Sequence, residues 1–278
     1  MSVDSNRGAI SSLLPPLLNK HEMGKVHSVF KKGMNFQFGE AVVFVSASDQ
    51  PLSAIGIQMP DDLFEDLMHS VRVEDLVVKR NGQVTIYGSK KTICIQTQDY
   101  RVVDLRMPRI HFNKRSIAKT KLYDCLNAFD FTQIIGLCVN DKTRYHIGQL
   151  IHSRWLLNDL SEHIAFFIGR GLGLTPSGDD MLAGFTMALK AFCEDQNWSI
   201  TLKKSLMKRE TTFVSLAYYK ALFNDHLSEN FIKLIGLLEI SDTDEINRTI
   251  KEVQAYGHTS GNDTLFGFLL GLKYLLSS

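Results

Sequence analysis

The chain has 278 residues, of which 44% are apolar and 22% charged, and these proportions are ordinary for a globular protein that buries a core of its own. Its 31 Lys and Arg balance 30 Asp and Glu, which argues against a nucleic-acid-binding protein and against a polybasic membrane-surface protein. Four scattered cysteines without Cys-x-x-Cys spacing, no apolar run of about 18 residues and no secretory leader predict a cytoplasmic protein with reduced thiols and no zinc site.

The N-terminal part of the chain is predicted to be a short arm followed by a mainly-β region. In the arm, residues 1–20, prolines interrupt a short apolar helix. Runs rich in β-branched and aromatic residues predict strands over 26–30, 41–45, 55–57, 76–79, 84–87 and 91–96. Asn81-Gly82 is typical of a two-residue hairpin turn. One helix is predicted from Asp61 to about Val71.

From about Ser116 onward the hydrophobic pattern takes the period of helices. A first apolar stripe comprises Leu122, Leu126 and Phe129, and a long helical tract runs from about Thr143 to Ile168. Further helices are predicted at roughly 179–194, 211–224, 227–239, 243–255 and 262–276. The predicted fold class is therefore α+β, with an arm over 1–20, a small mainly-β domain over 21–115 and a larger helical domain over 116–278.

Two related Gly-rich motifs lie in the predicted helical domain. The first contains Ser-Gly-Asp-Asp-Met-Leu-Ala-Gly-Phe (177–185) and the second contains Ser-Gly-Asn-Asp-Thr-Leu-Phe-Gly-Phe (260–268), so six of nine positions are identical. Gly184 and Gly267 recur in register inside the predicted helices. Because glycine within a helix costs on the order of 1 kcal/mol relative to alanine, we expect the two helices to pack closely together.

The start of each motif predicts a capped helix N-terminus. Ser177 and Ser260 stand where an N-cap residue belongs, and Asp180 and Asp263 follow three positions later, close to a capping box. A glycine at the first helical position leaves backbone N–H donors open, and the helix dipole favours an anion there. The pair could present two anion-accepting ends to one pocket, or it could be a structural pseudo-repeat with only one working end.

The pairing of Gly-Leu-Thr-Pro-Ser-Gly-Asp-Asp (173–180) with Gly-His-Thr-Ser-Gly-x-Asp (257–263) resembles the AllH family. The resemblance extends to residues 24–30, to Asn35-Phe36 and to Thr211-Thr212-x-x-Ser215. It implies one of several subunits of oxamate carbamoyltransferase, an enzyme of allantoin and purine catabolism that converts carbamoyl phosphate and oxamate to oxalurate and phosphate, or a relative of that reaction. Asn262 stands where the first copy has Asp179, so the two copies need not bind alike.

The candidate site residues are polar groups and glycines in and beside the two motifs. Those predicted to be catalytic, through proton or amide contacts, are Asp180, His258 and Asp263. Those predicted to bind substrate phosphate or carboxylate are Arg170, Gly173, Thr175, Ser177, Gly178, Asp179, Thr259, Ser260 and Gly261. No cofactor or metal-ligand set is predicted, and Mg²⁺ at the two aspartates Asp180 and Asp263 is left open.

The motifs also exclude several common sites. No Gly-Lys-Ser/Thr follows the Gly-rich turn as in a P-loop, a predicted helix precedes it where a dinucleotide site needs a strand, and no Gly-x-Ser-x-Gly elbow is present. Two alternatives to a carbamoyltransferase subunit stay open: a non-catalytic subunit that binds a metabolite or anion, and a phosphate-dependent enzyme acting on another small amide or acid. The expected partners are a small anionic substrate and other subunits of a carbamoyltransferase complex, with neither nucleic acid nor membrane.

Overall fold

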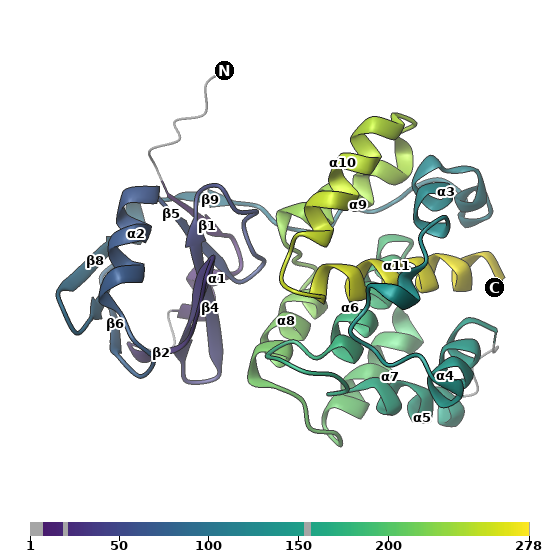
Figure 1. The fold of residues 1–278 in the computed structure, drawn as a ribbon, viewed down its shortest axis with the longest axis horizontal. Helices are drawn as coiled ribbons and strands as arrows, with labels where there is room; N and C mark the ends of the chain where they lie inside the picture. Colours follow the sequence, from purple (N-terminus) through teal and green to yellow (C-terminus); the bar gives the residue numbers. More distant parts are fainter. Residues whose placement is uncertain (1–7, 19–21, 153–156, 278) are drawn as a thin grey trace. The chain divides into compact units, whose positions relative to one another are not determined.

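The structure, a computed structural model, describes residues 8–18, 22–152 and 157–277. It divides into two units, one formed by residues up to 106 together with 224–229, and the other by residues 107–223 together with 230–277 (Figure 1). Strands dominate the first unit and helices the second, so the predicted α+β class is confirmed. No helix in the described ranges is long and apolar enough to cross a membrane.

The first unit is built on a single sheet. Its strands in the described residues are β1 (Ala9–Ser11), β2 (Met23–Phe30), β3 (Gly33–Phe38), β4 (Ala41–Ala47), β5 (Gly56–Met59), β6 (Leu76–Arg80), β7 (Gln83–Tyr87), β8 (Thr92–Gln96) and β9 (Arg101–Val103). They are hydrogen-bonded in the order β8-β7-β6-β2-β3-β4-β5-β1-β9. The β4–β5 and β1–β9 pairs are parallel and the other pairs are antiparallel.

Side-chain alternation explains why the β6–β7–β8 part of the sheet forms. Val84 and Ile86 of β7 and Ile93 and Ile95 of β8 are buried on one face, while the residues between them face outward. The hairpin between β6 and β7 turns at Asn81-Gly82, both with positive φ, as the sequence predicted. The local pattern therefore specifies both the strands and their register.

Some elements of the first unit were not predicted. Strand β3 is buried on both faces near the middle of the sheet, so it lacks the alternation that marks a half-exposed strand. Strands β1 and β9 have only three residues each, too few to show a period. Besides the sheet, the unit contains α1 (Leu14–Leu18), α2 (Asp61–Ser70) and the short turn η1 (Thr97–Asp99), and α2 confirms the predicted helix.

The second unit is helical. Its helices in the described residues are α3 (Lys121–Asn127), α4 (Asp141–His152), α5 (Leu157–Phe167), α6 (Ser177–Ala191), α7 (Gln196–Leu206), α8 (Phe213–Phe223), α9 (Glu229–Gly236, whose first residue is grouped with the other unit), α10 (Thr243–Gln254) and α11 (Ser260–Ser277). Short 3-10 turns are η2 (Lys114–Lys119), η3 (Phe131–Gln133) and η4 (Leu237–Glu239).

The described parts of the predicted helical tract over 143–168 are helices α4 and α5, and residues 153–156 lie outside the described residues. Helix α7 was not predicted, because its buried face combines Trp198 and Leu202 with small polar residues such as Ser199 and Ser205. Buried polar side chains weaken the apolar period on which helix prediction depends.

The two motif helices, α6 and α11, pack against each other at very short range (Figure 1). A Cβ atom added to Gly184 of α6 would lie 2.0 Å from the Thr264 carbonyl oxygen of α11. A Cβ atom added to Gly267 of α11 would lie 1.9 Å from the Met181 carbonyl oxygen of α6. These contacts are reciprocal between equivalent positions of the motifs, which confirms the expectation that the paired glycines mark two closely packed helices.

The same helix pair organises the surrounding core. Ala188 of α6 meets Gly271 of α11, where an added Cβ would approach the Ala188 Cβ to 2.6 Å. On α6, the buried Phe185 ring stacks on Trp198 of α7 at a centroid distance of 4.2 Å. The Trp198 indole N–H donates to the Thr186 hydroxyl at 2.7 Å. Small residues therefore allow α6 and α11 to approach closely, and the Phe185 and Trp198 rings pack α7 against α6.

Candidate functional site

Each motif helix begins directly after a turn, and its first residue is the motif serine. Helix α6 starts at Ser177, with Pro176 in the cap position and no side-chain cap hydrogen bond. Helix α11 starts at Ser260. The prediction that these serines are N-caps is wrong, because each helix starts one residue earlier than expected: the preceding Pro176 and Thr259 carbonyls accept the first helical hydrogen bonds.

The motif glycines that follow the serines do not leave open donors. The Gly178 N–H donates to the Arg170 carbonyl at 2.7 Å, and the Gly261 N–H donates to the Tyr256 carbonyl at 3.0 Å. An added Cβ at Gly178 would lie 2.0 Å from the Phe167 carbonyl oxygen, and one at Gly261 would lie 1.9 Å from that of Val253. The two glycines therefore permit close approach of the preceding backbone, and the expectation that their N–H groups are free for an anion is wrong.

The serine hydroxyls, free of capping, reach across to the aspartate of the other motif. Ser177 of the first motif hydrogen-bonds to Asp263 of the second. Ser260 of the second motif hydrogen-bonds to Asp180 of the first. The Thr175 and Ser260 hydroxyls are also hydrogen-bonded to each other at 2.8 Å. The similarity of the two motifs thus corresponds to a reciprocal pair of Ser–Asp contacts in one polar cluster.

Both aspartates of this cluster are held where their charged forms are poorly solvated. Burial raises the pKa of Asp263, which is fully buried, and hydrogen bonds from Ser177 and Thr259 oppose that rise. Burial raises the pKa of Asp180 well above its ordinary value; a hydrogen bond from Ser260 opposes the rise, and the negative charge of Asp263 adds to it. In each carboxyl group the Oδ2 atom is buried and has no hydrogen-bond partner among the described residues.

Gly136 is a site residue that the sequence did not reveal. It lies in the loop after η3, and its N–H donates to the Asp263 Oδ1 atom at 2.9 Å. An added Cβ at this position would lie 2.2 Å from the Ser177 Oγ atom and 2.9 Å from the Thr259 Oγ1 atom. The only signal in the sequence is a glycine between apolar residues, which is too common to mark a site.

Asp179 faces a different set of partners. Its Oδ1 atom accepts hydrogen bonds from the Gly169 N–H at 3.1 Å and from the Tyr219 hydroxyl at 3.3 Å, and its Oδ2 atom accepts one from the Thr211 hydroxyl. The residue is only 2% exposed, and burial raises its pKa. These bonds tie the turn before α6 to the residues that lead into α8. Asn262 occupies the equivalent position of the second motif, and its Oδ1 atom is buried without a hydrogen-bond partner among the described residues.

Three of the predicted residues, Arg170, Gly173 and His258, are exposed. The Arg170 guanidinium lies 3.9 Å from the centre of the Phe166 ring, and its Nε donates to the Phe166 carbonyl at 2.9 Å. His258 is exposed in the turn before α11, and Gly173 is exposed with φ of 91° in the turn before α6. The structure therefore brings together Thr175, Ser177, Asp180, Thr259, Ser260 and Asp263, and places the other three residues nearer to solvent.

The cluster can do proton and hydrogen-bond chemistry with its own side chains. It combines the fully buried Asp263 and the half-buried Asp180 with the hydroxyls of two serines and two threonines, and an electrostatic interaction is stronger there than in water. No group of three or more His, Cys, Asp and Glu side chains in the described part of the chain has the arrangement of a metal site. The unpaired Oδ2 atoms can accept hydrogen bonds from a ligand that carries N–H or O–H groups.

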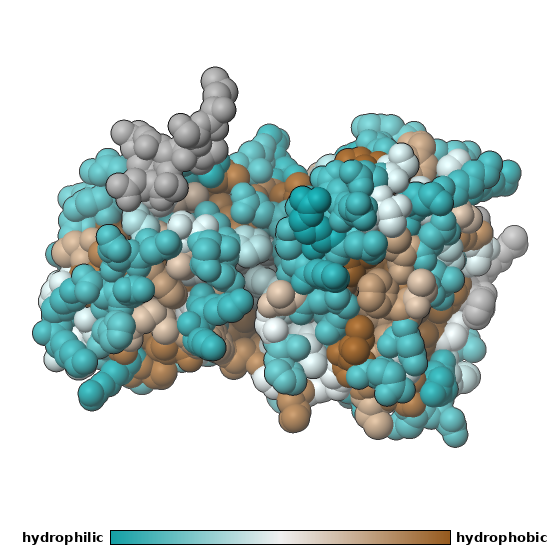
Figure 2. Space-filling model, turned by 45° about the horizontal axis from the view of Figure 1, so that its top comes forward, coloured by the Kyte–Doolittle hydropathy of each residue, from teal (hydrophilic) through white to brown (hydrophobic). Residues whose placement is uncertain are grey.

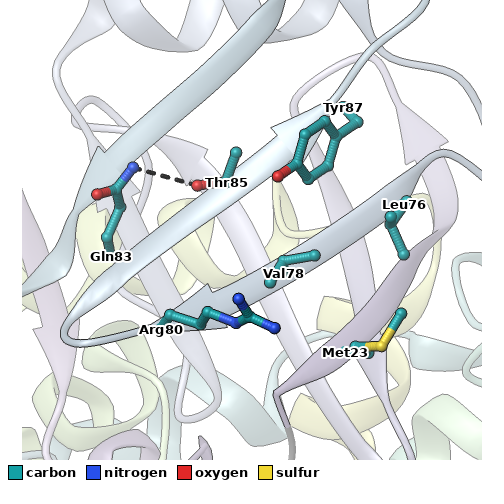
Figure 3. A pocket seen from close by; sticks show the side chains of 7 residues that line it. All are labelled: Met23, Leu76, Val78, Arg80, Gln83, Thr85 and Tyr87. Carbon is teal, nitrogen blue, oxygen red and sulfur yellow. Dashed lines mark hydrogen bonds between the residues drawn. The ribbon is translucent and has the colours of Figure 1, made fainter.

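A hollow lies on the sheet of the first unit (Figure 3). Its lining side chains are Met23, Leu76, Val78, Arg80, Gln83, Thr85 and Tyr87. The Gln83 amide donates to the Thr85 hydroxyl at 3.1 Å, and Arg80 lies 3.9 Å from the Glu22 carboxylate. None of these lining residues has a buried polar atom without a partner. The hollow therefore lacks the ligand-directed polar atoms that distinguish the Ser–Asp cluster.

Comparison with known proteins supports the resemblance seen in the motifs. The family described as oxamate carbamoyltransferase subunit AllH matches residues 167–272. No solved structure matches the chain. The matched segment begins at the last residue of α5 and ends within α11, so it contains both motifs and leaves Gly136 and strands β1 to β9 outside. From residue 167 to residue 272, the chain thus matches the AllH family of oxamate carbamoyltransferase subunits, as its two Ser-Gly motifs predicted.

Proposed function

We propose that the polar cluster between α6 and α11 is a carbamoyl-transfer site in a subunit of an oxamate carbamoyltransferase-like enzyme. The reaction would join carbamoyl phosphate and oxamate to give oxalurate and phosphate, or run in reverse, as a step of purine catabolism. The residues that would contact the substrates are Thr175, Ser177, Asp180, Thr259, Ser260 and Asp263. The observation that carries the proposal is the pair of unpaired, buried Oδ2 atoms on Asp180 and Asp263.

A buried polar atom left without a hydrogen-bond partner costs roughly 1–3 kcal/mol. Carbamoyl phosphate, oxamate and oxalurate all carry amide N–H groups that can donate to such atoms. A ligand of this kind would relieve the cost on binding. The exposed Arg170 and His258, next to the two motifs in the chain, would bind the phosphate and carboxylate groups of the same ligands.

A subunit is proposed because the matching family is described as one. The turn before α6 supports a contact with another chain at this place. Leu172 is 94% exposed there, between Gly171 and Gly173, which both have positive φ. Figure 2 shows polar and apolar residues interspersed over the face that it draws. Leu172, fully exposed directly before the first motif, is a suitable point for a partner subunit to dock.

Thermal unfolding with ligands tests the proposal. Oxamate, oxalurate and carbamoyl phosphate should raise the melting temperature of the chain, because a ligand present at 100 times its Kd adds about 2.7 kcal/mol to the stability of the folded state. Ser177→Ala should weaken the effect, since it removes a hydroxyl from the cluster. The matched control is Ser241→Ala, which alters an exposed serine of the same unit and should leave the ligand effect intact.

The outcomes separate the candidate functions. A shift produced by phosphate alone, equal for Ser177→Ala, would favour an anion-binding subunit without carbamoyl chemistry. No shift with any of the amide ligands, both for the chain alone and with its copurifying subunits, would overturn the proposal. A magnesium requirement would show as a ligand effect that EDTA abolishes and Mg²⁺ restores.

A further inference from the structure

We infer that the two aspartates of the cluster have different roles, with Asp180 holding and donating a proton and Asp263 accepting one as a carboxylate, and that Gly136 is the positioning residue that makes them differ. The inference rests on the proposed function, since it assigns a role to each residue of that site. Gly136 lies outside the segment matched by the AllH family, whereas its partner Asp263 lies inside it.

The motifs alone would make the two aspartates equivalent. Each follows its motif serine by three residues, each hydrogen-bonds to the serine of the other motif, and each has a buried Oδ2 atom without a partner. A difference between Asp180 and Asp263 must therefore come from residues beyond the repeat.

Gly136 supplies that difference. Its backbone N–H donates to Asp263 Oδ1 at 2.9 Å, and an N–H group can only donate, so this bond favours the ionised carboxylate. Asp180 is flanked by the Ser260 and Thr175 hydroxyls, which are bonded to each other at 2.8 Å. A hydroxyl can either donate or accept, so this environment accommodates a protonated carboxyl group as well as a charged one.

Neighbouring charges act in the same direction. The titratable groups that face Asp180 are Asp263 on α11, Asp179 beside it on α6 and Tyr219 on α8. Both aspartates, when charged, raise the pKa of Asp180. Burial, with smaller contributions from the charges of Asp179 and Asp180, raises the pKa of Tyr219 well above its ordinary value, so Tyr219 stays neutral. With one proton available to the pair, Asp180 is the residue that holds it.

One protonated and one ionised carboxyl group match the proton balance of the proposed reaction. The amide nitrogen of oxamate forms a bond to the carbamoyl carbon, the bond from that carbon to the phosphate oxygen breaks, and its electron pair leaves with the phosphate. One proton must leave the nitrogen and one must reach the phosphate. Asp263 takes the first and Asp180 supplies the second, so the products are oxalurate and hydrogen phosphate. Exchange with water then restores the starting state of the pair.

The location of the proton can be measured without substrate. A protonated carboxyl group has a carbonyl-stretch infrared band that ¹³C labelling of aspartate assigns to this residue type. At pH 7 we expect a band that disappears in Asp180→Asn and persists in Asp263→Asn, with a lower titration midpoint in the latter because a neighbouring negative charge is gone. The matched control is Asp124→Asn, at an exposed helix position, which should leave the band unchanged.

Loss of the band in Asp263→Asn with retention in Asp180→Asn would overturn the assignment, and so would the absence of any such band at pH 7.

The part played by Gly136 is tested in the Asp180→Asn background. There Gly136→Ala should raise the pH at which Asp263 ionises, and an unchanged titration would show that Gly136 does not position it. Gly148→Ala, where an added Cβ meets no atom within 4 Å, controls for the substitution itself. A chain that shows the expected proton but binds no amide ligand would reject the proposed function and keep the assignment.

Discussion

A serine at a helix start can bond to the N–H groups of its own helix or to a distant partner, and Ser177 and Ser260 do the latter. Each hydroxyl hydrogen-bonds to an aspartate of the other motif helix, where it stabilises the charged form of that carboxyl group. Their own helix starts need no side-chain cap because carbonyl groups of the preceding residues accept the first helical hydrogen bonds. The serines are thereby available to the candidate site.

The raised pKa of Asp180 predicts a pH-dependent stability. Its ordinary pKa is 3.8, and burial raises the pKa in the folded state well above that value. Between these two pKa values the folded chain binds a proton that the unfolded chain has lost, so this group makes the free energy of unfolding fall as pH rises from about 4 toward the folded pKa. In Asp180→Asn the free energy of unfolding should fall less over this pH range, since the amide does not titrate.

Urea unfolding at pH 5 and pH 8 checks this prediction. Relative to the wild type, Asp180→Asn should gain stability at pH 8 more than at pH 5, because each unit of pKa difference corresponds to about 1.4 kcal/mol. The exposed Asp124→Asn serves as the control for the amide substitution. An equal effect of Asp180→Asn at both pH values would show that Asp180 titrates as an ordinary aspartate.

Gly136→Ala should destabilise the second unit. The added methyl group would lie 2.2 Å from the Ser177 Oγ atom, so Ser177 or the loop must move, and such overpacking typically costs about 1–3 kcal/mol. Gly148→Ala in α4 has open space around the new methyl group and should be neutral or stabilising by up to about 1 kcal/mol. Chemical denaturation of both variants provides the measurement, and equal stabilities would contradict the predicted contact.

At the scale of elements, the central feature is the α6–α11 pair. Small residues face backbone of the other helix at equivalent positions, and the short distance between the axes brings both helix starts into one polar cluster. The same glycines that cost helix propensity are therefore required for the position of the candidate site. Asp179 adds a second constraint by tying the turn before α6 to Thr211 and Tyr219.

Alanine at Gly184 or Gly267 should force the helix pair apart. Each new methyl group would meet a backbone carbonyl oxygen at about 2 Å, and a backbone atom cannot move aside as the end of a flexible side chain can. We expect a loss of at least about 1–3 kcal/mol in each variant, against the small gain expected from helix propensity. Gly236→Ala, with no atom within 4 Å of the added Cβ, is the matched control.

Thermal or urea unfolding of these three variants tests the close packing directly. The ligand-induced shift in melting temperature should also weaken in Gly184→Ala and Gly267→Ala, because a wider separation of the helices moves Asp180 away from Ser260. Retention of both stability and ligand response in these variants would refute the link between helix separation and the site.

At the scale of the whole molecule, the matched family predicts an activity that depends on other chains. The isolated chain should bind amide ligands but form oxalurate from carbamoyl phosphate and oxamate slowly or not at all, and turnover should rise when its copurifying subunits are added. Release of phosphate and formation of oxalurate are the measurements. Leu172→Asp should reduce the rise while leaving the unfolding curve of the chain alone unchanged, because Leu172 is 94% exposed. Full turnover by the isolated chain would contradict the dependence.

The sequence by itself determined the α+β class, most strands and helices, the hairpin at Asn81-Gly82 and the close packing of the two motif helices. These follow from periodicity, turn chemistry and the helix cost of glycine, which are properties of residues close together in the chain. It also indicated the AllH family, because the two motifs are contiguous runs. The sequence did not predict β3 and α7, because their residues show no clear period of apolar side chains.

Only the tertiary structure decided which polar groups meet. The pairing of Ser177 with Asp263 and of Ser260 with Asp180, and the bond from Gly136 to Asp263, join residues more than 75 positions apart in the chain. The hydrogen bond from the Gly178 N–H to the Arg170 carbonyl forms because the preceding turn folds back onto the start of α6. Such contacts depend on the path of the whole backbone, which no local pattern encodes, and they convert two predicted anion sites into one cluster of crossed Ser–Asp pairs.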